Sequence, residues 1–192
     1  MLAGACGGGS FRYLTHRDSG TYMKVPDDWT VYGTEDTVAA LVSGGDPLST
    51  PDIRWAAAFD ANPQPSLDHF FGLDATAKHP TGFVQVRTLS AQERDEVSQA
   101  SLRNSILNID ENSQIEVLAG PVEVSHSATI DGQRVIFNIR RSNGFFTVDQ
   151  TTLLDHRAGE FYLLMVGCEV SCFLDQRDVI DKLVTSWTIK KR

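Results

Sequence analysis

The sequence predicts one α+β domain, in which an antiparallel β-sheet meander is covered by a long middle helix and a C-terminal helix. Three observations predict this class. Between residues 114 and 166, alternating or continuous apolar segments are separated by turn residues, as in hairpin-linked strands. Residues 90–108 open with a helix-capping pattern and contain neither glycine nor proline. Residues 175–184 carry apolar side chains at helical spacing.

The first half of the domain is expected to consist of strands, loops and one helical turn. Residues 54–59 are short and apolar, which indicates a buried strand, although their alanines leave a helix open. The other expected elements are a strand over 21–25, a turn over 26–29 closed by the core residue Trp29, an extended segment over 30–32, a loop over 43–52, a helical turn over 66–71 and a strand over 82–89.

The middle helix is predicted over residues 90–108. Ser90 is the expected N-cap, and Glu93 three residues later completes a capping box. Acidic residues in the first turn also suit the positive end of the helix dipole. The predicted inner face consists of Val97, Leu102, Ile106 and Ile109.

Turn signals divide the region that follows into strands. Asp131-Gly132 is a strong signal for a two-residue hairpin turn, and 142–144 predicts a second turn. The continuous apolar run over 161–166 predicts a central strand.

The C-terminal helix is expected to begin at Asp175 as its cap, with Leu174 and Val179 forming a hydrophobic staple. Its predicted inward residues are Ile180, Leu183 and Val184. A last extended segment is expected over 186–189.

Composition limits the possible partners. The chain has 192 residues, which is enough for one domain with a substantial core. Its net charge of −8 would repel nucleic-acid phosphates, so we expect no nucleic-acid partner. No stretch approaches the roughly 20 apolar residues of a membrane span.

The N-terminal run around Cys6 is the most informative motif. In Leu2-Ala3-Gly4-Ala5-Cys6-Gly7-Gly8-Gly9-Ser10, small residues precede a single cysteine and a glycine-serine stretch follows it. This run resembles the lipobox of bacterial lipoproteins, although Ala3 stands where a large aliphatic residue is usual. The resemblance implies a diacylglycerol on Cys6 that anchors the protein to a membrane. The alternative is a plain thiol in a disordered end, and a phosphate-binding loop is excluded because no Gly-Lys-Ser/Thr follows.

The lipobox-like run divides the chain into two parts. Residues 1–19 are predicted to be a flexible tether and residues 20–192 the single domain. A lipid on Cys6 would also leave the other two cysteines as a pair.

Cys168 and Cys172 are expected to form a disulfide bond if the protein lies in an oxidising compartment. A zinc site lacks a second pair of ligands at suitable spacing, and a redox Cys-X-X-Cys motif would have two intervening residues instead of three. Two free buried thiols remain the alternative in the cytosol.

The sequence shows no convincing catalytic constellation, and we predict no catalytic residue, metal or cofactor. The five histidines, at 16, 69, 79, 126 and 156, are dispersed without metal-ligand spacing, and no Gly-x-Ser-x-Gly elbow occurs. A cavity lined by a hydrogen-bonded His–Ser or His–carboxylate pair would favour an enzyme instead.

Two aromatic pairs form the candidate binding surface. In extended structure, Phe70-Phe71 and Phe145-Phe146 would each place their rings on opposite faces, so that one ring of each pair is exposed. Exposed rings beside a loop would suit a ligand groove or a partner. The alternative is that helices cover both faces of the sheet.

The order of elements resembles the PsbP-like fold. The turn Val25-Pro26-Asp27-Asp28-Trp29 opens the domain and the helix ending Ile180-Asp181-Lys182-Leu183-Val184-Thr185-Ser186-Trp187 closes it. This fold occurs in photosystem II extrinsic proteins, in a nuclear-import adaptor family and in small actinobacterial lipoproteins. The resemblance implies binding or assembly, with no shared catalytic residues, and it is an analogy of fold.

Together these features lead to the expectation of an extracytoplasmic, lipid-anchored envelope protein that binds an unidentified protein or small ligand without catalysis. A cell-envelope hydrolase with dispersed catalytic residues, and a cytosolic adaptor of the same fold, are the alternatives.

Overall fold

The computed structural model describes residues 10–43, 52–72, 77–104, 107–157 and 159–190. The strands are β1 (Phe11–His16), β2 (Thr21–Pro26), β3 (Thr30–Tyr32), β4 (Ile53–Asp60), β5 (Thr81–Thr88), β6 (Ile115–Ser127), β7 (Ile130–Arg141), β8 (Gly144–Asp155), β9 (Glu160–Glu169) and β10 (Thr188–Ile189). The helices are α1 (Thr34–Ser43), α2 (Asp68–Phe71), α3 (Ala91–Glu96), α4 (Gln99–Asn104), α5 (Val170–Asp175) and α6 (Arg177–Ser186).

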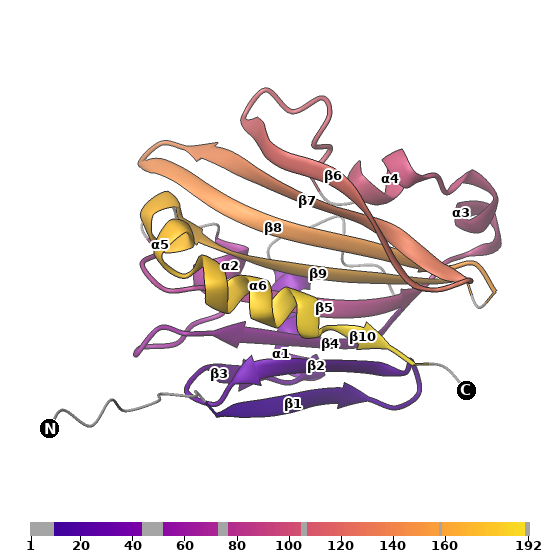
Figure 1. The fold of residues 1–192 in the computed structure, drawn as a ribbon, viewed down its shortest axis with the longest axis horizontal. Helices are drawn as coiled ribbons and strands as arrows, with labels where there is room; N and C mark the ends of the chain where they lie inside the picture. The colour runs from indigo at the N-terminus through magenta and orange to yellow at the C-terminus, as the bar shows by residue number, and fades with distance from the viewer. Residues whose placement is uncertain (1–9, 44–51, 73–76, 105–106, 158, 191–192) are drawn as a thin grey trace, which may run out of the picture.

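Within these residues the strands form two antiparallel sheets (Figure 1). The large sheet has the order β3-β4-β5-β9-β8-β7-β6, and the small sheet has the order β1-β2-β10. The apolar run predicted as a central strand is β9, which lies between β5 and β8 as expected. The α+β antiparallel class predicted from the sequence is therefore confirmed.

The two faces of the large sheet carry separate hydrophobic cores. On one face, residues of β5 and β9 pack against β2 and α6, where Met23, Ile180 and Leu183 are almost fully buried. Figure 1 shows α6 lying in front of this face. On the other face, Phe83, Phe146 and their neighbours pack against α1 and α2. This alternation places successive strand residues in different cores, as the strand period of two requires.

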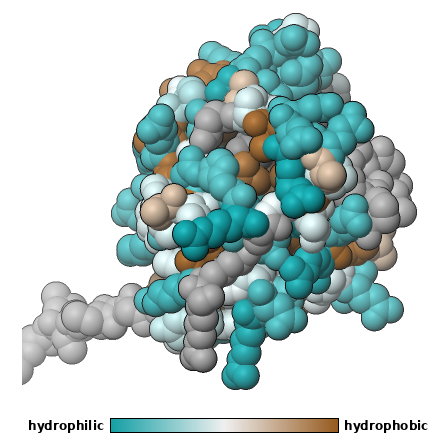
Figure 2. All heavy atoms as spheres, turned by 90° about the vertical axis from the view of Figure 1, so that its right-hand side faces the viewer, coloured by the Kyte–Doolittle hydropathy of each residue, from teal (hydrophilic) through white to brown (hydrophobic). Residues whose placement is uncertain are grey.

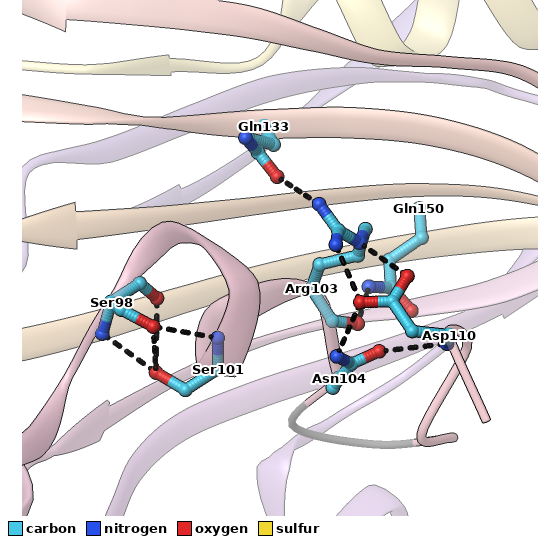
Figure 3. Close-up of polar contacts among 7 residues, drawn as sticks. All are labelled: Ser98, Ser101, Arg103, Asn104, Asp110, Gln133 and Gln150. Atoms are coloured by element: carbon cyan, nitrogen blue, oxygen red, sulfur yellow. Dashed lines mark hydrogen bonds and ion pairs between the residues drawn. The ribbon is translucent and has the colours of Figure 1, made fainter.

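The predicted middle helix is wrong as a continuous element. The structure contains two short helices, α3 and α4, and Val97 between them has extended backbone angles (φ −66°, ψ 131°). Ser90 and Glu93 do form the predicted capping box. The break arises because Ser98 starts a new helix: its hydroxyl accepts from the Ser101 N–H at 3.1 Å, and its own N–H donates to the Ser101 hydroxyl at 2.7 Å (Figure 3).

Arg103 joins this segment to the large sheet. Its guanidinium pairs with Asp110 at 2.5 Å and donates to Gln133 of β7 at 3.1 Å, and its carbonyl accepts from Gln150 of β8 at 3.0 Å. Asn104 also donates to Asp110 at 2.8 Å. Figure 3 shows these groups converging over β7 and β8. Of the predicted inner face, Ile109 is buried in the core on this side of the sheet and Val97 packs against that core, so the segment covers the sheet through apolar contacts as well as through these polar ones.

The predicted tether is too long at its C-terminal end. Residues 11–16 form β1, which pairs along its whole length with β2, from Phe11 opposite Pro26 to His16 opposite Thr21. The domain therefore includes these residues, while Cys6 lies outside the described residues. Helix α1 was not predicted, and most of the predicted loop over 43–52 lies outside the described residues.

The hairpin predicted at Asp131-Gly132 is displaced by three residues. The turn lies at 128–129, and Asp131 already pairs with Ser125 across β6 and β7. Gly132 serves a different purpose, because a Cβ there would lie 1.9 Å from the backbone oxygen of Thr152. The glycine therefore permits a close strand approach instead of a turn.

The C-terminal region differs from the prediction at its start. Asp175 ends α5, and α6 begins after Gln176 without a side-chain cap. Leu174 is 63% exposed, so the predicted staple does not form. The inward residues Ile180, Leu183 and Val184 are buried as predicted. In the described part of the chain, none of the helices has the length and apolar character needed to span a membrane.

Candidate functional site

A cavity of about 480 Å³ opens between the large sheet and the C-terminal segment. We call it the β6–β10 cavity. Its lining consists of Val124, Ser125, His126, Arg134, Thr151, Val184, Thr185, Trp187, Thr188, Ile189 and Lys190. Figure 1 shows β6 bending across the sheet toward β10 on the side of the C-terminus. Seen from that side, the surface is mostly hydrophilic, with small hydrophobic patches (Figure 2).

The strand register and the end of α6 assemble this cavity. Arg134 of β7 lies directly opposite Thr151 of β8, so both side chains belong to the same face of the sheet. Helix α6 ends at Ser186 with Trp187 as its C-cap, and the two residues after Trp187 pair with β2 as β10. Trp187 is thereby held over the sheet, where it is 2% exposed.

Two buried polar atoms of the lining have no hydrogen-bond partner among the described residues. They are the indole Nε1 of Trp187 and the hydroxyl of Thr151, which is 3% exposed as a residue. A buried polar group without a partner costs about 1–3 kcal/mol. Both atoms are closed to solvent, and unpartnered buried atoms also occur outside the cavity, on Gln85, Arg141 and Gln150, so these two atoms do not by themselves mark a ligand site.

Arg134 forms the charged part of the lining. Its Nε donates to Asp149 at 2.9 Å and its Nη2 at 2.5 Å, and Nη2 also pairs with Asp181 of α6. The hydrogen bonds to Asp149 raise the pKa of Arg134 further above its ordinary value. Burial raises the pKa of Asp149, whose side chain is 1% exposed. The guanidinium is therefore already bound by two carboxylates and links α6 to the sheet.

His126 closes the β6 side of the cavity. Its Nδ1 accepts the backbone N–H of Ile189 at 3.3 Å, and its ring lies edge-on to Trp187 with centroids 6.1 Å apart. Since an accepting Nδ1 carries no proton, the neutral ring holds its proton on Nε2. Burial lowers the pKa of His126, which keeps the ring neutral at physiological pH.

We expect acid to weaken the fold through His126. The folded state binds a proton at this ring less readily than the unfolded chain, whose histidine pKa is about 6.5. Stability is therefore unaffected by this group well above pH 6.5 and falls as the pH drops below it. Urea unfolding at pH 7.5 and pH 5.5 should show a smaller acid loss for His126→Gln than for the wild type. Equal losses in the two proteins would contradict this assignment.

Among the described residues, three histidine pairs outside the cavity meet the geometric criterion for catalysis but have structural explanations. One of them, His156 Nε2 with Asp131 at 2.6 Å, is a solvent-exposed pair that links the end of β8 to β7. His16 Nδ1 lies 2.8 Å from the Ser19 hydroxyl, but Ser19 is 0% exposed and also bonds Thr21. His69 Nδ1 lies 2.7 Å from Asp60, which also accepts the backbone N–H groups of residues 62 and 66. Ser19 is therefore closed to substrate, and Asp60 holds the turn after β4 through its hydrogen bonds to the backbone.

The predicted aromatic surface is reduced to one residue of each pair. Phe70 and Phe146 are 4% and 0% exposed, and their rings meet in the core at 6.1 Å. Phe71 and Phe145 are partly exposed, so each pair does divide as predicted. However, Phe71 packs edge-on against Phe70, and the Arg140 guanidinium lies over the Phe145 ring. Phe70 and Phe146 belong to the hydrophobic core on this side of the sheet, and only Phe71 and Phe145 remain available to a partner.

The predicted cysteine pair lies at bonding distance. The sulfur atoms of Cys168 in β9 and Cys172 in α5 are 2.10 Å apart, with 5.9 Å between the Cα atoms. Both residues are buried in the core below α6. This bridge ties α5 to the end of the central strand.

A smaller hollow of about 230 Å³ lies on the other face, beside α3. Its Arg87 pairs with Glu93 at 2.6 Å, and its Ser101 is bonded to Ser98. Because these polar groups have partners, the hollow gives weaker evidence of a ligand than the β6–β10 cavity.

The cavity residues were missed from the sequence, although one signal was available. Strand β8 contains the polar residues Thr147, Asp149, Gln150, Thr151 and Thr152, and all are buried. A polar run inside a hairpin-linked central strand is unusual, because buried polar groups need specific partners. The polar run in β8 is the sequence signal that would have drawn attention to this part of the sheet.

The two sheets with their helices define a PsbP-like α+β fold. No protein-family model matches the chain, and comparison with curated proteins gave no match. Solved structures that share the fold include LpqN of Mycobacterium tuberculosis, with 13% sequence identity and a TM-score of 0.53, where the match covers 96% of this chain and 92% of LpqN. The Ran-binding protein Mog1p of Saccharomyces cerevisiae has 7% identity and a TM-score of 0.51, with 95% of this chain and 96% of Mog1p covered. The cyanobacterial PsbP of Synechocystis has 9% identity and a TM-score of 0.50, with 99% of this chain and 98% of that chain covered. LpqN is described as involved in cell envelope biogenesis. At these identities the likeness concerns the fold.

Proposed function

We propose that the protein is a non-enzymatic binding module of the cell envelope, anchored by a lipid on Cys6, and that its ligand occupies the β6–β10 cavity. The single observation that carries the ligand site is the β6–β10 cavity itself, which lies between the large sheet and the C-terminal segment and combines apolar side chains with a few polar ones. A cavity of this volume falls within the range of about 300–1,000 Å³ that is usual for small-molecule sites.

The chemistry of the lining supports binding over catalysis. His126 uses Nδ1 to accept from the backbone, and Arg134 is engaged by Asp149 and Asp181. Within the described lining, no hydroxyl is hydrogen-bonded to a histidine or carboxylate side chain that would activate it as a nucleophile. These groups are arranged to hold a shape and to offer hydrogen bonds.

Three features support the envelope location. The run around Cys6 resembles a lipobox, the pair Cys168–Cys172 lies at disulfide distance, and the fold is shared with an envelope protein of Mycobacterium tuberculosis. Disulfides persist mainly in oxidising compartments. Two or more acyl chains on Cys6 would give stable anchoring, where one chain is marginal.

The anchor is tested by expressing the full-length gene in its host and weighing the mature N-terminal peptide. We expect added lipid mass on Cys6 and a protein that fractionates with membranes. Cys6→Ser should release the protein into the soluble fraction, and the neighbouring change Ser10→Ala should not. An N-terminal Cys6 without lipid mass would disprove the anchor.

The ligand site is tested by native mass spectrometry of the protein purified from host envelopes. We expect a bound small molecule in the wild type and its loss in Val124→Trp, because Val124 is a half-buried residue of the cavity lining on β6, where a larger side chain would take up the space of the ligand. Val122→Trp is the matched control, since Val122 is 60% exposed on the same strand and does not line the cavity. A wild-type protein that carries no small molecule, or equal occupancy in both variants, would contradict the site.

A further inference from the structure

The small sheet turns one side toward the core and the other side away from it. Leu14 of β1 and Met23 and Val25 of β2 belong to the core side. Because successive strand residues lie on opposite sides of a sheet, Phe11 and Tyr13 belong to the other side. We call this side the outer β1–β2 face, and by strand alternation and register it consists of Phe11, Tyr13, Thr15, Tyr22 and Lys24.

The aromatic rings of this face are open to solvent. Tyr13 is 66% exposed and Phe11 is 39% exposed. Lys24 lies opposite Tyr13 in the strand register, and its Nζ lies 5.8 Å from the centre of the Tyr13 ring. Tyr22 on the same face is partly exposed. Exposed large side chains that gather in one place are typical of an interaction surface.

We propose that the outer β1–β2 face lies against the surface of the membrane that holds the anchor, with the rings of Phe11 and Tyr13 among the lipid headgroups. The partner is thus a bilayer surface of zwitterionic and anionic lipids. This inference rests on the proposed function, because it takes Cys6 as the anchor point.

The position of the anchor brings this face close to the membrane. Cys6 precedes Phe11 by five positions, and β1 is the first described strand after it, at the lower margin of the molecule in Figure 1. Five residues span at most about 18 Å even when fully extended. A short tether gives the attached face an effective concentration in the millimolar range. Even a weak attraction of this face for lipid is therefore sufficient to hold the domain in one orientation.

The chemistry of the face suits the interface between water and lipid. Tyrosine concentrates there because its ring is apolar while its hydroxyl stays hydrated. Lys24 adds a positive charge on a long stem that can reach lipid phosphates. The adjoining turn carries the exposed Asp27 and Asp28, and the whole chain has a net charge of −8. Charge alone would therefore not attract this protein to an anionic membrane, and the rings supply the main attraction.

Strand β6 offers an internal comparison. Leu118 and Val122 are 50% and 60% exposed, as open to solvent as the rings of β1. However, β6 is the outer strand of the large sheet, and these residues follow Cys6 by more than 100 positions. If exposed apolar side chains alone decided the contact, β6 would meet the membrane as readily as β1.

The test couples the full chain through Cys6 to a maleimide lipid in nanodiscs of phosphatidylcholine and phosphatidylglycerol. This fixes the anchor whether or not the host adds one, and Cys6 is the thiol left for coupling when the other two cysteines are bridged. Lipids with a nitroxide on the headgroup broaden the amide resonances of nearby residues. We expect the broadening at residues 11–15 and 22–24 to exceed that at residues 117–122 several-fold.

Matched variants assign the contact to side chains. Phe11→Ser combined with Tyr13→Ser should abolish the preferential broadening, and Tyr13→Ser alone, at the more exposed position, should reduce it without changing the melting temperature. Leu118→Ser combined with Val122→Ser is the control and should leave the broadening unchanged. Lys24→Gln should lower the ratio of docked to free protein by about five-fold, the change expected for one lysine at an anionic surface.

The outcomes separate this inference from the proposed function. Uniform broadening, stronger broadening at β6, or unchanged broadening in Tyr13→Ser would overturn the orientation, while lipid mass on Cys6 from the host would leave the anchor intact. Preferential broadening at β1 would support the face even if the host added no lipid, in which case the proposed anchor alone fails. Concentration-dependent shifts of the same resonances in lipid-free Cys6→Ser protein would assign the face to a second copy of the chain and overturn the membrane contact.

Discussion

Replacing Arg134 with methionine should lower the free energy of unfolding by about 3–5 kcal/mol, the range found when one partner of a buried ion pair is removed. The reason is Asp149, whose side chain is 1% exposed and depends on Arg134 for its charged hydrogen bonds. Without the guanidinium, this carboxylate must fold either unpaired or protonated. Urea unfolding at pH 7.5 measures the loss.

Two controls make this prediction specific to the buried pair. Combining Arg134→Met with Asp149→Leu should recover most of the lost stability, because a buried ion pair is replaceable by apolar side chains of similar volume. Asp181→Asn should cost less than about 1 kcal/mol, since the Asp181 side chain is 50% exposed and its ion pair is screened by solvent. A single Arg134→Met variant no less stable than Asp181→Asn would refute the assignment.

Replacing Phe146 with alanine should cost about 3–5 kcal/mol of stability, as large-to-small changes of buried aromatic residues do. Phe146 is 0% exposed, and its ring meets Phe70 edge-on at 6.1 Å in the second core. The lost contacts would leave a cavity that the surrounding β-sheet cannot close. Thermal or urea unfolding gives the size of the effect.

The adjacent residue supplies the comparison. Phe145→Ala should cost no more than about 1 kcal/mol, because this side chain is partly exposed and its main described contact is the Arg140 guanidinium, 5.5 Å from the ring centroid. Similar losses for Phe145 and Phe146 would mean that the two faces of β8 are not buried as differently as the structure shows.

Patterns within a few neighbouring residues were sufficient to predict several elements of the fold. Residues 161–166 were predicted as a central strand because a short apolar run must be buried on both faces, and β9 lies inside the large sheet. Ser90 and Glu93 were predicted to cap a helix because both hydrogen bonds lie within four residues. The spacing of Cys168 and Cys172 likewise placed two partners within one short segment.

Prediction failed where a residue serves a distant neighbour. Gly132 carries a turn signal, but its absent side chain admits the backbone of Thr152 from the next strand. Ser98 divides the middle helix because it caps a second one, and that helix is held by Arg103 contacts to β7 and β8. Phe11–His16 was assigned to the tether because its strand character becomes evident only once it pairs with β2.

The sequence by itself determined the α+β class, the central strand, the cysteine pair and the lipobox-like run at Cys6, because each depends on neighbours within a few residues. Only the tertiary structure forms the cavity in which we propose that a ligand binds. The β6–β10 cavity joins residues 124–126, 134, 151, 184–185 and 187–190, and the two unpartnered atoms of Thr151 and Trp187 lie 36 positions apart in the chain. Whether a buried polar group has a partner depends on every segment that folds over it, so that property has no local signature.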